Sequence, residues 1–407
     1  MNSGASTPGG SPANHPDVLV LGGGLGATAL VAALRGGGFT GSVTVVCGED
    51  RMPYDRPPLS KELFDRDEPA GLAEQFSLSP GDAAWLTGRR ATAITPAAGG
   101  FRVSATDAVG DVHSLDAPVV VVATGVRPVV PVEWSGVRTL STWEDARALR
   151  AALAPGTTLA IVGAGWVGLE LASAAAAAGV RVTVVDALDR PLGTVTPPGV
   201  GARIAGWLAA AGVAFVPGGA TAAGAATVTL ADGRVLDAAV VVAALGARPA
   251  TAWLPAGWLT GTGHVLVDGV GAVRGAAGAF AIGDCTAVDG RADQHWNAAV
   301  AAAERCAAAI LGHVPPAPRP PAVFSTMYGH SVDMVGRADP HADVIWREDT
   351  AGGWTALLTR DGALVAGMAV DRPRDVAALR RILARDRPRI DPGLAANAVR
   401  PLTVAPA

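Results

Sequence analysis

Two stretches decide the fold of this chain, Asp17-Val-Leu-Val-Leu-Gly-Gly-Gly-Leu-Gly-Ala27 near the N-terminus and Leu159-Ala-Ile-Val-Gly-Ala-Gly-Trp-Val-Gly168 in mid-chain. Each places a glycine-rich turn between a short apolar run and an alanine- and leucine-rich segment, which predicts a strand, a tight turn and a helix. Glycines let the backbone approach a pyrophosphate, and the helix N-terminus supplies free N–H groups and a positive dipole end. Two such units predict two bound dinucleotides and an electron path between them.

An acidic residue follows each glycine-rich turn at the distance expected of a ribose ligand. Asp186 ends an apolar run 23 residues after Gly163. A carboxylate there accepts both adenosine ribose hydroxyls and repels a 2′-phosphate, so we expect NADH at the second turn, with NADPH disfavoured. Arg190 nearby weakens that preference. After the first turn the better candidate is Glu49, beside Asp50; the alternative for these acids is that they only cap loops.

Composition bounds the remaining possibilities. At 407 residues the chain is long enough for two or three domains with ample core. Its 32 basic and 36 acidic residues give a net charge of −4, which argues against nucleic-acid binding. We find no apolar run long enough to span a membrane and no signal-peptide pattern in residues 1–16, so we expect a disordered tail there and a cytoplasmic protein.

The cysteines exclude one class of electron path. Cys47, Cys285 and Cys306 are far apart, without any C-x-x-C pair. This spacing argues against a redox-active disulfide, an iron–sulfur cluster or a zinc site, so we expect no bound metal. Electrons must therefore leave by a route other than a dithiol.

Further apolar runs and one linker organise the rest of the chain. Three runs read as buried strands that end at a site: Val119 to Gly125, Ala239 to Gly246, and Ala279 to Asp284. The clearest linker is 315–321, with five prolines in seven residues. Short alternating runs beyond it predict a small antiparallel sheet and a terminal helix.

Lys61 is the only lysine among the 32 basic residues. A composition that otherwise uses arginine suggests that this position needs something arginine cannot provide. A compact ammonium on a flexible stem fits a tight pocket, whereas the guanidinium fork does not. The alternative is an ordinary surface lysine.

The chain resembles a known family through several motifs in register. It is similar to the FAD-dependent NAD(P)H:ferredoxin reductases of bacterial oxygenase and cytochrome P450 systems, which have a glutathione-reductase-like fold and are related to apoptosis-inducing factor. The resemblance covers about residues 17–312, and the C-terminal part more loosely. It rests on both glycine-rich turns and on Pro53-Tyr-Asp-Arg-Pro-Pro-Leu-Ser-Lys61, Ala123-Thr-Gly-Val-Arg-Pro128, Ala279–Asp284 and His295-Trp-Asn297.

The resemblance implies an α/β fold with two Rossmann-like dinucleotide-binding domains, one for FAD and one for NAD, and a small C-terminal α+β domain. The expected boundaries are a tail at 1–16, an FAD-binding domain from 17–127 and 248–316, an NAD-binding domain at 128–247, and the C-terminal domain at 317–407.

The resemblance also implies roles for individual residues. Arg56 and Arg127 are expected near the flavin phosphates, Asp284 at the ribityl chain and Trp296 at the pyrimidine edge of the flavin. Lys61 is expected beside flavin N5, paired with Glu170, as the two catalytic residues. The complete set of expected cofactor-binding residues is Gly22, Gly24, Ala27, Glu49, Arg56, Lys61, Thr124, Arg127, Gly163, Gly165, Gly168, Glu170, Asp186, Gly246, Asp284 and Trp296.

The Lys61–Glu170 pair also makes chemical sense. An ammonium beside N5 stabilises negative charge on a reduced flavin, and a carboxylate fixes the ammonium while contacting the nicotinamide. Read alone, Glu170 could instead be an acid placed near a helix start by the helix dipole.

The expected function is transfer of electrons from NADH through FAD to a [2Fe–2S] ferredoxin, which serves an oxygenase or cytochrome P450. We expect a monomer or weak homodimer. Nine arginines against five aspartates between Arg360 and Arg400 suggest a face for an acidic ferredoxin, or simply a solvated helix face. Where the family usually has Trp-Ser, this chain has Phe324-Ser-Thr-Met-Tyr328, which leaves open an NADH oxidase or small-molecule reductase. A redox sensor with a binding role is a third possibility.

Overall fold

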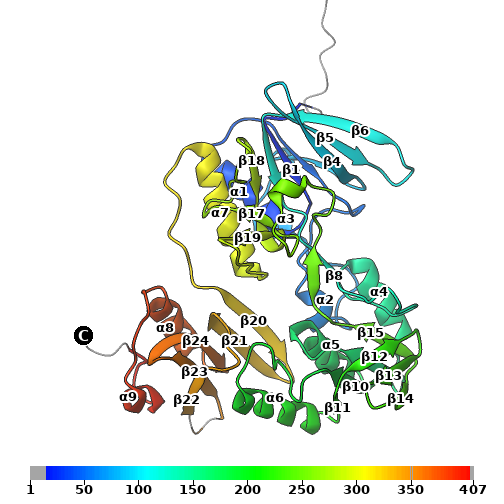
Figure 1. The fold of residues 1–407 in the computed structure, drawn as a ribbon, viewed down its shortest axis with the longest axis vertical. Helices are drawn as coiled ribbons and strands as arrows, with labels where there is room; N and C mark the ends of the chain where they lie inside the picture. The colour runs from blue at the N-terminus through cyan, green and yellow to red at the C-terminus, as the bar shows by residue number, and fades with distance from the viewer. Residues whose placement is uncertain (1–14, 349, 351, 404–407) are drawn as a thin grey trace, which may run out of the picture. The chain divides into compact units, whose positions relative to one another are not determined.

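The computed structural model describes residues 15–348, 350 and 352–403, so most of the expected tail at 1–16 lies outside the described residues. The chain divides into two compact units (Figure 1). Unit 1 contains the chain up to Asp55, Ala70–Val126 and Arg248–Ala317; unit 2 contains Arg56–Pro69, Arg127–Ala247 and the chain from Pro318 onward. The last boundary falls inside the proline-rich stretch. The assignment of FAD and NAD to separate domains stays a prediction.

Unit 1 is built on a five-stranded parallel sheet in the order β18-β7-β1-β2-β3. Every residue of β1 and β2 is buried. Both faces of this sheet are covered, which explains why β1 is a continuous apolar run and why Thr44 is the single polar residue of β2. The strands are β1 (Val18–Leu21), β2 (Val43–Val46), β3 (Ala84–Leu86), β7 (Val119–Val122) and β18 (Ala279–Ala281).

Alternate residues of β1 belong to different cores. Leu19 and Leu21 pack with an antiparallel sheet, while Val18 and Val20 pack with two helices, as the two-residue period of a strand requires. The antiparallel sheet is β4 (Arg90–Ala97), β5 (Gly100–Thr106) and β6 (Val112–Ala117), and the helices are α1 (Leu25–Gly36) and α7 (Trp296–Leu311). Smaller elements are α3 (Leu72–Gln75), η1 (Ala256–Trp258), β17 (Val265–Val267), η2 (Gly283–Cys285) and β19 (Thr286–Val288).

Unit 2 repeats this plan with a four-stranded parallel sheet in the order β11-β10-β9-β15. Ala160, Val162 and Val185 share a core with Val228 and Leu230 of a second antiparallel sheet. The parallel strands are β9 (Thr158–Val162), β10 (Arg181–Asp186), β11 (Ala214–Pro217) and β15 (Val240–Ala243); the antiparallel ones are β12 (Ala220–Ala223), β13 (Thr227–Leu230) and β14 (Val235–Asp237). The helices are α2 (Pro58–Lys61), α4 (Trp143–Ala152), α5 (Trp166–Ala177) and α6 (Pro198–Ala210). The chain leaves and re-enters unit 1 through β8 (Val126–Pro128) and β16 (Ala247–Pro249).

The C-terminal part of unit 2 is the antiparallel sheet and helix that the alternating runs predicted. Its strand order is β20-β21-β24-β23-β22, and Val376, Leu379 and Ile382 of α8 pack against it. The elements are β20 (Ala322–Met327), β21 (His330–Gly336), β22 (Asp343–Glu348), β23 (Trp354–Arg360), β24 (Ala363–Val370), α8 (Pro373–Leu383) and α9 (Pro392–Ala396).

An aromatic cluster within unit 2 joins α6 to this sheet. Trp207 stacks on His330 with ring centroids 4.5 Å apart, and the Arg203 guanidinium lies 4.0 Å from the ring centroid of Trp346. Trp354 packs edge-on against Trp346. Such contacts are individually worth about 0.5–1.5 kcal/mol. They fix the C-terminal sheet against the parallel-sheet part of the same unit.

Within the described residues, we find no helix with both the length and the hydropathy that a membrane crossing requires.

Candidate functional site

The first glycine-rich turn has the geometry of a phosphate cradle. Gly22 has φ +117°, and a Cβ there would lie 2.3 Å from the carbonyl oxygen of Ala123. Only glycine is compatible with that backbone and that contact. Gly24 precedes α1, and a Cβ on it would meet open space. Ala27 is fully buried one turn into α1.

The second turn repeats these features in unit 2. Gly163 has φ +114°, and its Cβ would lie 2.3 Å from the carbonyl oxygen of Ala244. Gly165 precedes α5 and also faces open space. A Cβ on Gly168 would lie 2.0 Å from the carbonyl oxygen of Gly163, so this glycine allows the helix to pack closely on the turn.

The N-termini of α1 and α5 are left free for an anion. Neither helix has a side-chain cap or an acidic residue in its first turn. By contrast, α4 has a complete capping box in which Thr142 and Asp145 satisfy each other's backbone N–H groups. Uncapped N–H groups and a positive dipole end are what a dinucleotide pyrophosphate requires. Both turns therefore fit the cofactors that the sequence predicts.

Asp186 lies at the end of β10, where the sequence placed it. One carboxylate oxygen accepts the backbone N–H of Ala164, in the second turn, at 2.6 Å, and the other accepts that of Leu188 at 2.8 Å. The carboxylate is thus fixed beside the turn, with lone pairs left for ribose hydroxyls. Arg190 Nη1 lies 2.8 Å from the carboxylate of Asp189, which is 79% exposed, while Arg190 Nε is buried without a hydrogen-bond partner among the described residues.

In unit 1 the expected FAD-binding residues are placed by local contacts. Glu49 accepts a hydrogen bond from the Tyr54 hydroxyl at 2.6 Å. Trp296 donates through Nε1 to Asp55 at 3.0 Å and stacks on Phe76 with ring centroids 6.2 Å apart. Half-buried Thr124 follows β7, and half-buried Asp284 lies in η2.

Arg56, Arg127 and Gly246 belong to unit 2. Both arginines are exposed, and Gly246, with φ +87°, lies between β15 and β16. The flavin roles expected of the two arginines stay predictions.

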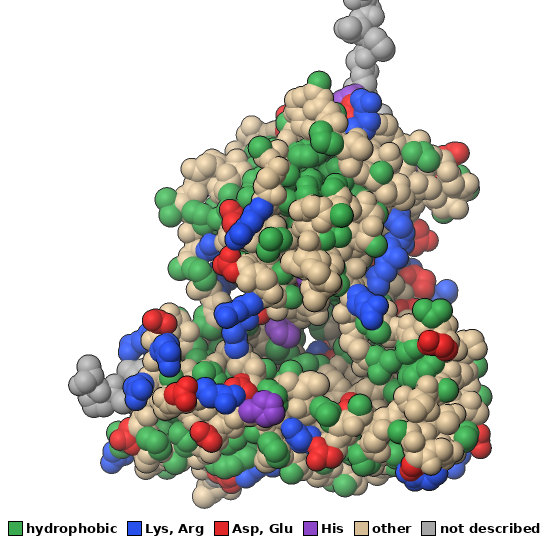
Figure 2. Space-filling view, viewed as in Figure 1, with side chains coloured by type: hydrophobic (Ala, Val, Ile, Leu, Met, Phe, Trp, Pro, Cys, Tyr) green, Lys and Arg blue, Asp and Glu red, His purple; other side chains and the backbone are tan. Residues whose placement is uncertain are grey.

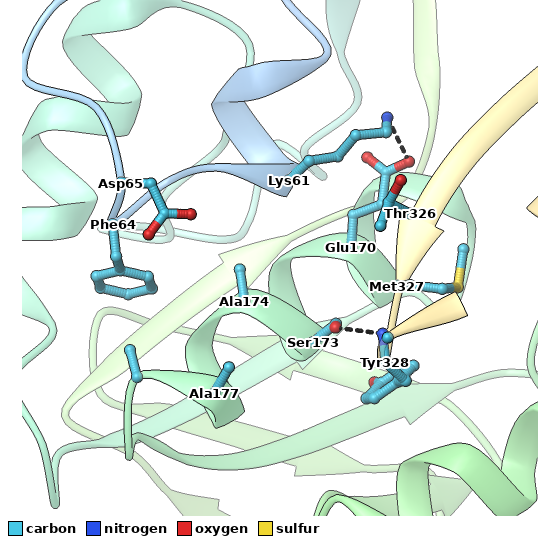
Figure 3. Close-up of a pocket in the computed structure, with 12 residues that line it drawn as sticks. Lys61, Phe64, Asp65, Glu170, Ser173, Ala174, Ala177, Thr326, Met327 and Tyr328 are labelled. Atoms are coloured by element: carbon cyan, nitrogen blue, oxygen red, sulfur yellow. Dashed lines mark hydrogen bonds and ion pairs between the residues drawn. The ribbon is translucent and has the colours of Figure 1, made fainter. Parts of the chain in front are cut away.

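Lys61 and Glu170 form an ion pair within unit 2, as the family resemblance implies. The Lys61 ammonium lies 2.8 Å from Oε1 of Glu170, and the two side chains are 14% and 5% exposed (Figure 3). Lys61 ends α2, and Glu170 projects from α5 five residues after Gly165. The ammonium also lies 5.5 Å from the ring centroid of Phe324. A mostly buried lysine that is paired with a buried carboxylate holds its positive charge at a fixed position.

Two serines that the sequence analysis did not assign a role also bind Glu170. Ser60 donates to Oε2 at 2.5 Å, and Ser325 donates to Oε1 at 2.6 Å. Ser60 belongs to the motif that ends at Lys61, and Ser325 belongs to segment 324–328, which differs from the usual family pattern. Nothing in the linear sequence shows that they share one carboxylate.

A cavity of about 340 Å³ adjoins this ion pair (Figure 3). Its apolar wall comes from the alanines of α5, Phe64 and Met327, and Lys61 and Glu170 also line it. The Tyr328 hydroxyl is buried without a hydrogen-bond partner in the described part of the chain, and burial raises the pKa of Tyr328 above its usual 10.

The cysteines do not form a redox pair. All three are free and buried. Burial raises the pKa of Cys285 to about 11 and that of Cys47 to about 12, so neither is a thiolate at neutral pH. Among the residues the structure covers, we find no group of three His, Cys, Asp or Glu side chains that could hold a metal ion.

Comparison with known families accounts for nearly all of the described chain. Residues 16–304 match the family described as pyridine nucleotide-disulphide oxidoreductase, and residues 323–405 match the family described as reductase C-terminal.

Curated proteins of similar sequence include two reductase components. The chain is 32% identical to the chlorobenzene dioxygenase ferredoxin reductase component of Cupriavidus sp. (strain PS12), covering 93% of this chain and 95% of the relative. It is also 32% identical to the benzene 1,2-dioxygenase system ferredoxin–NAD(+) reductase subunit of Pseudomonas putida, covering 91% and 92%.

Solved structures share the fold across the chain. The crystal structure of Fdr9 has a TM-score of 0.83 at 29% identity, covering 96% of this chain and 99% of that one. The covalent putidaredoxin reductase–putidaredoxin complex also gives 0.83, at 26% identity, covering 95% and 96%.

Proposed function

We propose a function from the premise that this chain belongs to the pyridine nucleotide-disulphide oxidoreductase family: it is an FAD-dependent reductase that takes electrons from NADH and passes them to a ferredoxin. The observation that carries this proposal is the pair of open glycine-rich turns, each before a helix without a side-chain cap. FAD, when bound, accepts a hydride from NADH and gives up its electrons singly, which suits an iron–sulfur partner. We propose that this partner is a [2Fe–2S] ferredoxin serving an oxygenase or cytochrome P450.

We assign the FAD pyrophosphate to the turn at Gly22 and Gly24, and the NADH pyrophosphate to the turn at Gly163 and Gly165. The contacts of Asp186 support NADH over NADPH, because its fixed carboxylate repels a 2′-phosphate. The chain's contribution to catalysis is then to bind and orient two reactants, which removes much of the entropic barrier to hydride transfer.

We assign Lys61 the role of fixing positive charge beside the flavin ring, and Glu170 the role of holding Lys61. Lys61→Ala should retain FAD and slow flavin reduction by NADH by about 100-fold, the cost typical of removing one preorganised donor. Lys61→Arg is the matched control that keeps the charge but not the compact ammonium. An unchanged rate of flavin bleaching in Lys61→Ala, followed anaerobically in a stopped-flow instrument, would remove this role.

We propose that an acidic ferredoxin docks on arginines of α8 and the turn after it. Arg374, Arg381, Arg385 and Arg387 are exposed and form no ion pair in the described part of the chain. Others of the basic segment are already neutralised: Arg360 pairs with Asp339, and Arg372 with Asp375. Figure 2 shows basic and acidic side chains interspersed on the visible face.

One assay separates the ferredoxin reductase from an NADH oxidase or small-molecule reductase. The purified protein should reduce a [2Fe–2S] ferredoxin with NADH much faster than it consumes dioxygen. Oxygen consumption that is unaffected by ferredoxin would favour the oxidase. We also propose a cytoplasmic location and a monomer or weak homodimer, which cell fractionation and size-exclusion chromatography with and without NADH would test.

A further inference from the structure

The Glu170 carboxylate is held by three donors from two segments far apart in sequence. Oε1 accepts from the Lys61 ammonium at 2.8 Å and from the Ser325 hydroxyl at 2.6 Å. Oε2 accepts from the Ser60 hydroxyl at 2.5 Å. Ser60 and Lys61 end α2, whereas Ser325 lies in β20 of the C-terminal sheet.

A lysine alone would not fix the orientation of this carboxylate. Glu170 is 5% exposed, so water contributes little to its solvation, and an ammonium can bond either oxygen as the group rotates. A serine on each oxygen removes that freedom. Ser60 is 5% exposed and Ser325 is 2% exposed, so both hydroxyls are themselves fixed by their surroundings.

A second contact fixes β20 on the same helix. The backbone N–H of Tyr328 donates to Ser173 Oγ at 2.6 Å, and Ser173 lies three residues after Glu170 on α5 (Figure 3). Tyr328 has φ +52°, an unusual conformation for a bulky residue that the surrounding contacts must maintain. The hydrogen bonds from Ser325 and from the backbone of Tyr328 therefore fix the position of β20 along α5.

We propose that Ser325 and Ser60 are positioning residues for hydride transfer, and that the C-terminal sheet, through Ser325, completes the site formed by Lys61 and Glu170. This inference rests on the role proposed above for that ion pair. Neither serine is expected to contact the substrate. Each acts by fixing the carboxylate, and thereby the position of the ammonium.

The test is single-turnover reduction of the bound flavin by NADH in the holoprotein without oxygen. We expect Ser325→Ala to lower the limiting rate by roughly five- to tenfold, about the contribution of one ordinary hydrogen bond, because the carboxylate keeps its other two donors. The dissociation constant for NADH is obtained from the dependence of the rate on NADH concentration. It should change less than about twofold, because Ser325 does not contribute to the binding of NADH before the reaction. Ser325→Thr keeps the hydroxyl and should restore most of the rate.

Ser331→Ala is the matched control. Ser331 lies on the neighbouring strand β21, is exposed, and does not line the cavity beside Lys61 and Glu170. This variant should reduce its flavin at the wild-type rate. Ser60→Ala removes the donor to the other oxygen and should give the same kind of loss. The double variant should lose less than the product of the two single effects, because both serines orient one carboxylate.

The outcomes separate this inference from the proposed function. If NADH does not reduce the wild-type flavin, the proposed function fails. If wild type is reduced and Ser325→Ala matches it, the positioning role is overturned. If Ser325→Ala loses FAD, Ser60→Ala and Ser325→Thr decide: a slow Ser60→Ala with a fast Ser325→Thr supports the role, and any other combination contradicts it.

Discussion

The two glycine-rich turns have the same backbone geometry at the first glycine but differ in how closely the following helix approaches the turn. Gly22 and Gly163 have nearly the same positive φ, and each would drive a Cβ against a strand carbonyl at 2.3 Å. The third position differs. α1 accommodates the methyl group of Ala27 as fully buried packing, whereas α5 lies so close to its turn that only Gly168 fits. The first glycine of each turn is thus required by backbone geometry, while the residue allowed at the third position depends on how closely the helix approaches the turn.

The acids differ as well. Asp186 is bonded directly to a backbone N–H of its own turn, whereas Glu49 accepts from Tyr54. The Asp186 side chain therefore supports the second turn directly, whereas the Glu49 carboxylate is held by a tyrosine five residues further along the chain.

The largest effects should come from matched substitutions at the first glycines. Gly22→Ala should yield protein without FAD, and Gly163→Ala should keep FAD but lose reduction by NADH by about 100-fold or more, because each forces a residue into a strained φ and a clash. Flavin absorbance of the purified variants and stopped-flow bleaching measure the two results. Loss of FAD in Gly163→Ala, with FAD kept in Gly22→Ala, would reverse the assignment of the turns.

Substitutions at the third position of each turn should change the free energy of unfolding by different amounts. Gly168→Ala places a Cβ 2.0 Å from a carbonyl oxygen and should destabilise unit 2 by about 2–3 kcal/mol. Ala27→Gly removes a buried methyl from a helix and should cost about 1 kcal/mol. Denaturant unfolding gives both values. Equal costs would mean that the helices approach their turns equally closely.

Substitutions of Asp186 and Glu49 should show which nucleotide each acid helps to bind. Asp186→Asn should lower kcat/KM for NADH by roughly tenfold, because charged hydrogen bonds to the ribose are lost. The value for NADPH should change much less, because the same substitution also removes the repulsion of the 2′-phosphate. Glu49→Gln, the matched change in unit 1, should weaken FAD retention and leave the ratio of NADH to NADPH unchanged. A shifted ratio in Glu49→Gln would contradict the assignment.

The smallest effect should fall outside both turns. Arg381→Glu with Arg385→Glu should slow ferredoxin reduction several-fold at low salt, with a smaller difference at high salt, and leave flavin reduction by NADH unchanged. Arg147→Glu changes an exposed arginine of α4 and is the control. Equal losses in both variants would mean that overall charge, not the α8 cluster, steers the partner.

The sequence sufficed for features fixed by local backbone chemistry. The turns, the valine-rich strands and the placement of Asp186 follow from short motifs whose conformations few residues can adopt. The family resemblance added the pairing of Lys61 with Glu170. Neither predicted the sheets β4–β6 and β12–β14. The strands β12–β14 are short, and in β4 and β5 buried alanines such as Ala91 and Ala105 give little hydropathy contrast. Nor did the sequence or the resemblance join Ser325 to Glu170, since these residues are 155 positions apart and meet only through the packing of β20 on α5.

The central claim is that the cofactors assigned to the two turns carry electrons in one direction, from NADH through FAD to a ferredoxin. The most direct measurement mixes the holoprotein anaerobically with NADH and a [2Fe–2S] ferredoxin, while flavin and ferredoxin absorbance are followed separately. We predict that the flavin is bleached first and that the ferredoxin is then reduced at the expense of NADH. A protein without bound flavin, or a flavin that NADH bleaches while the ferredoxin stays oxidised, would contradict the account.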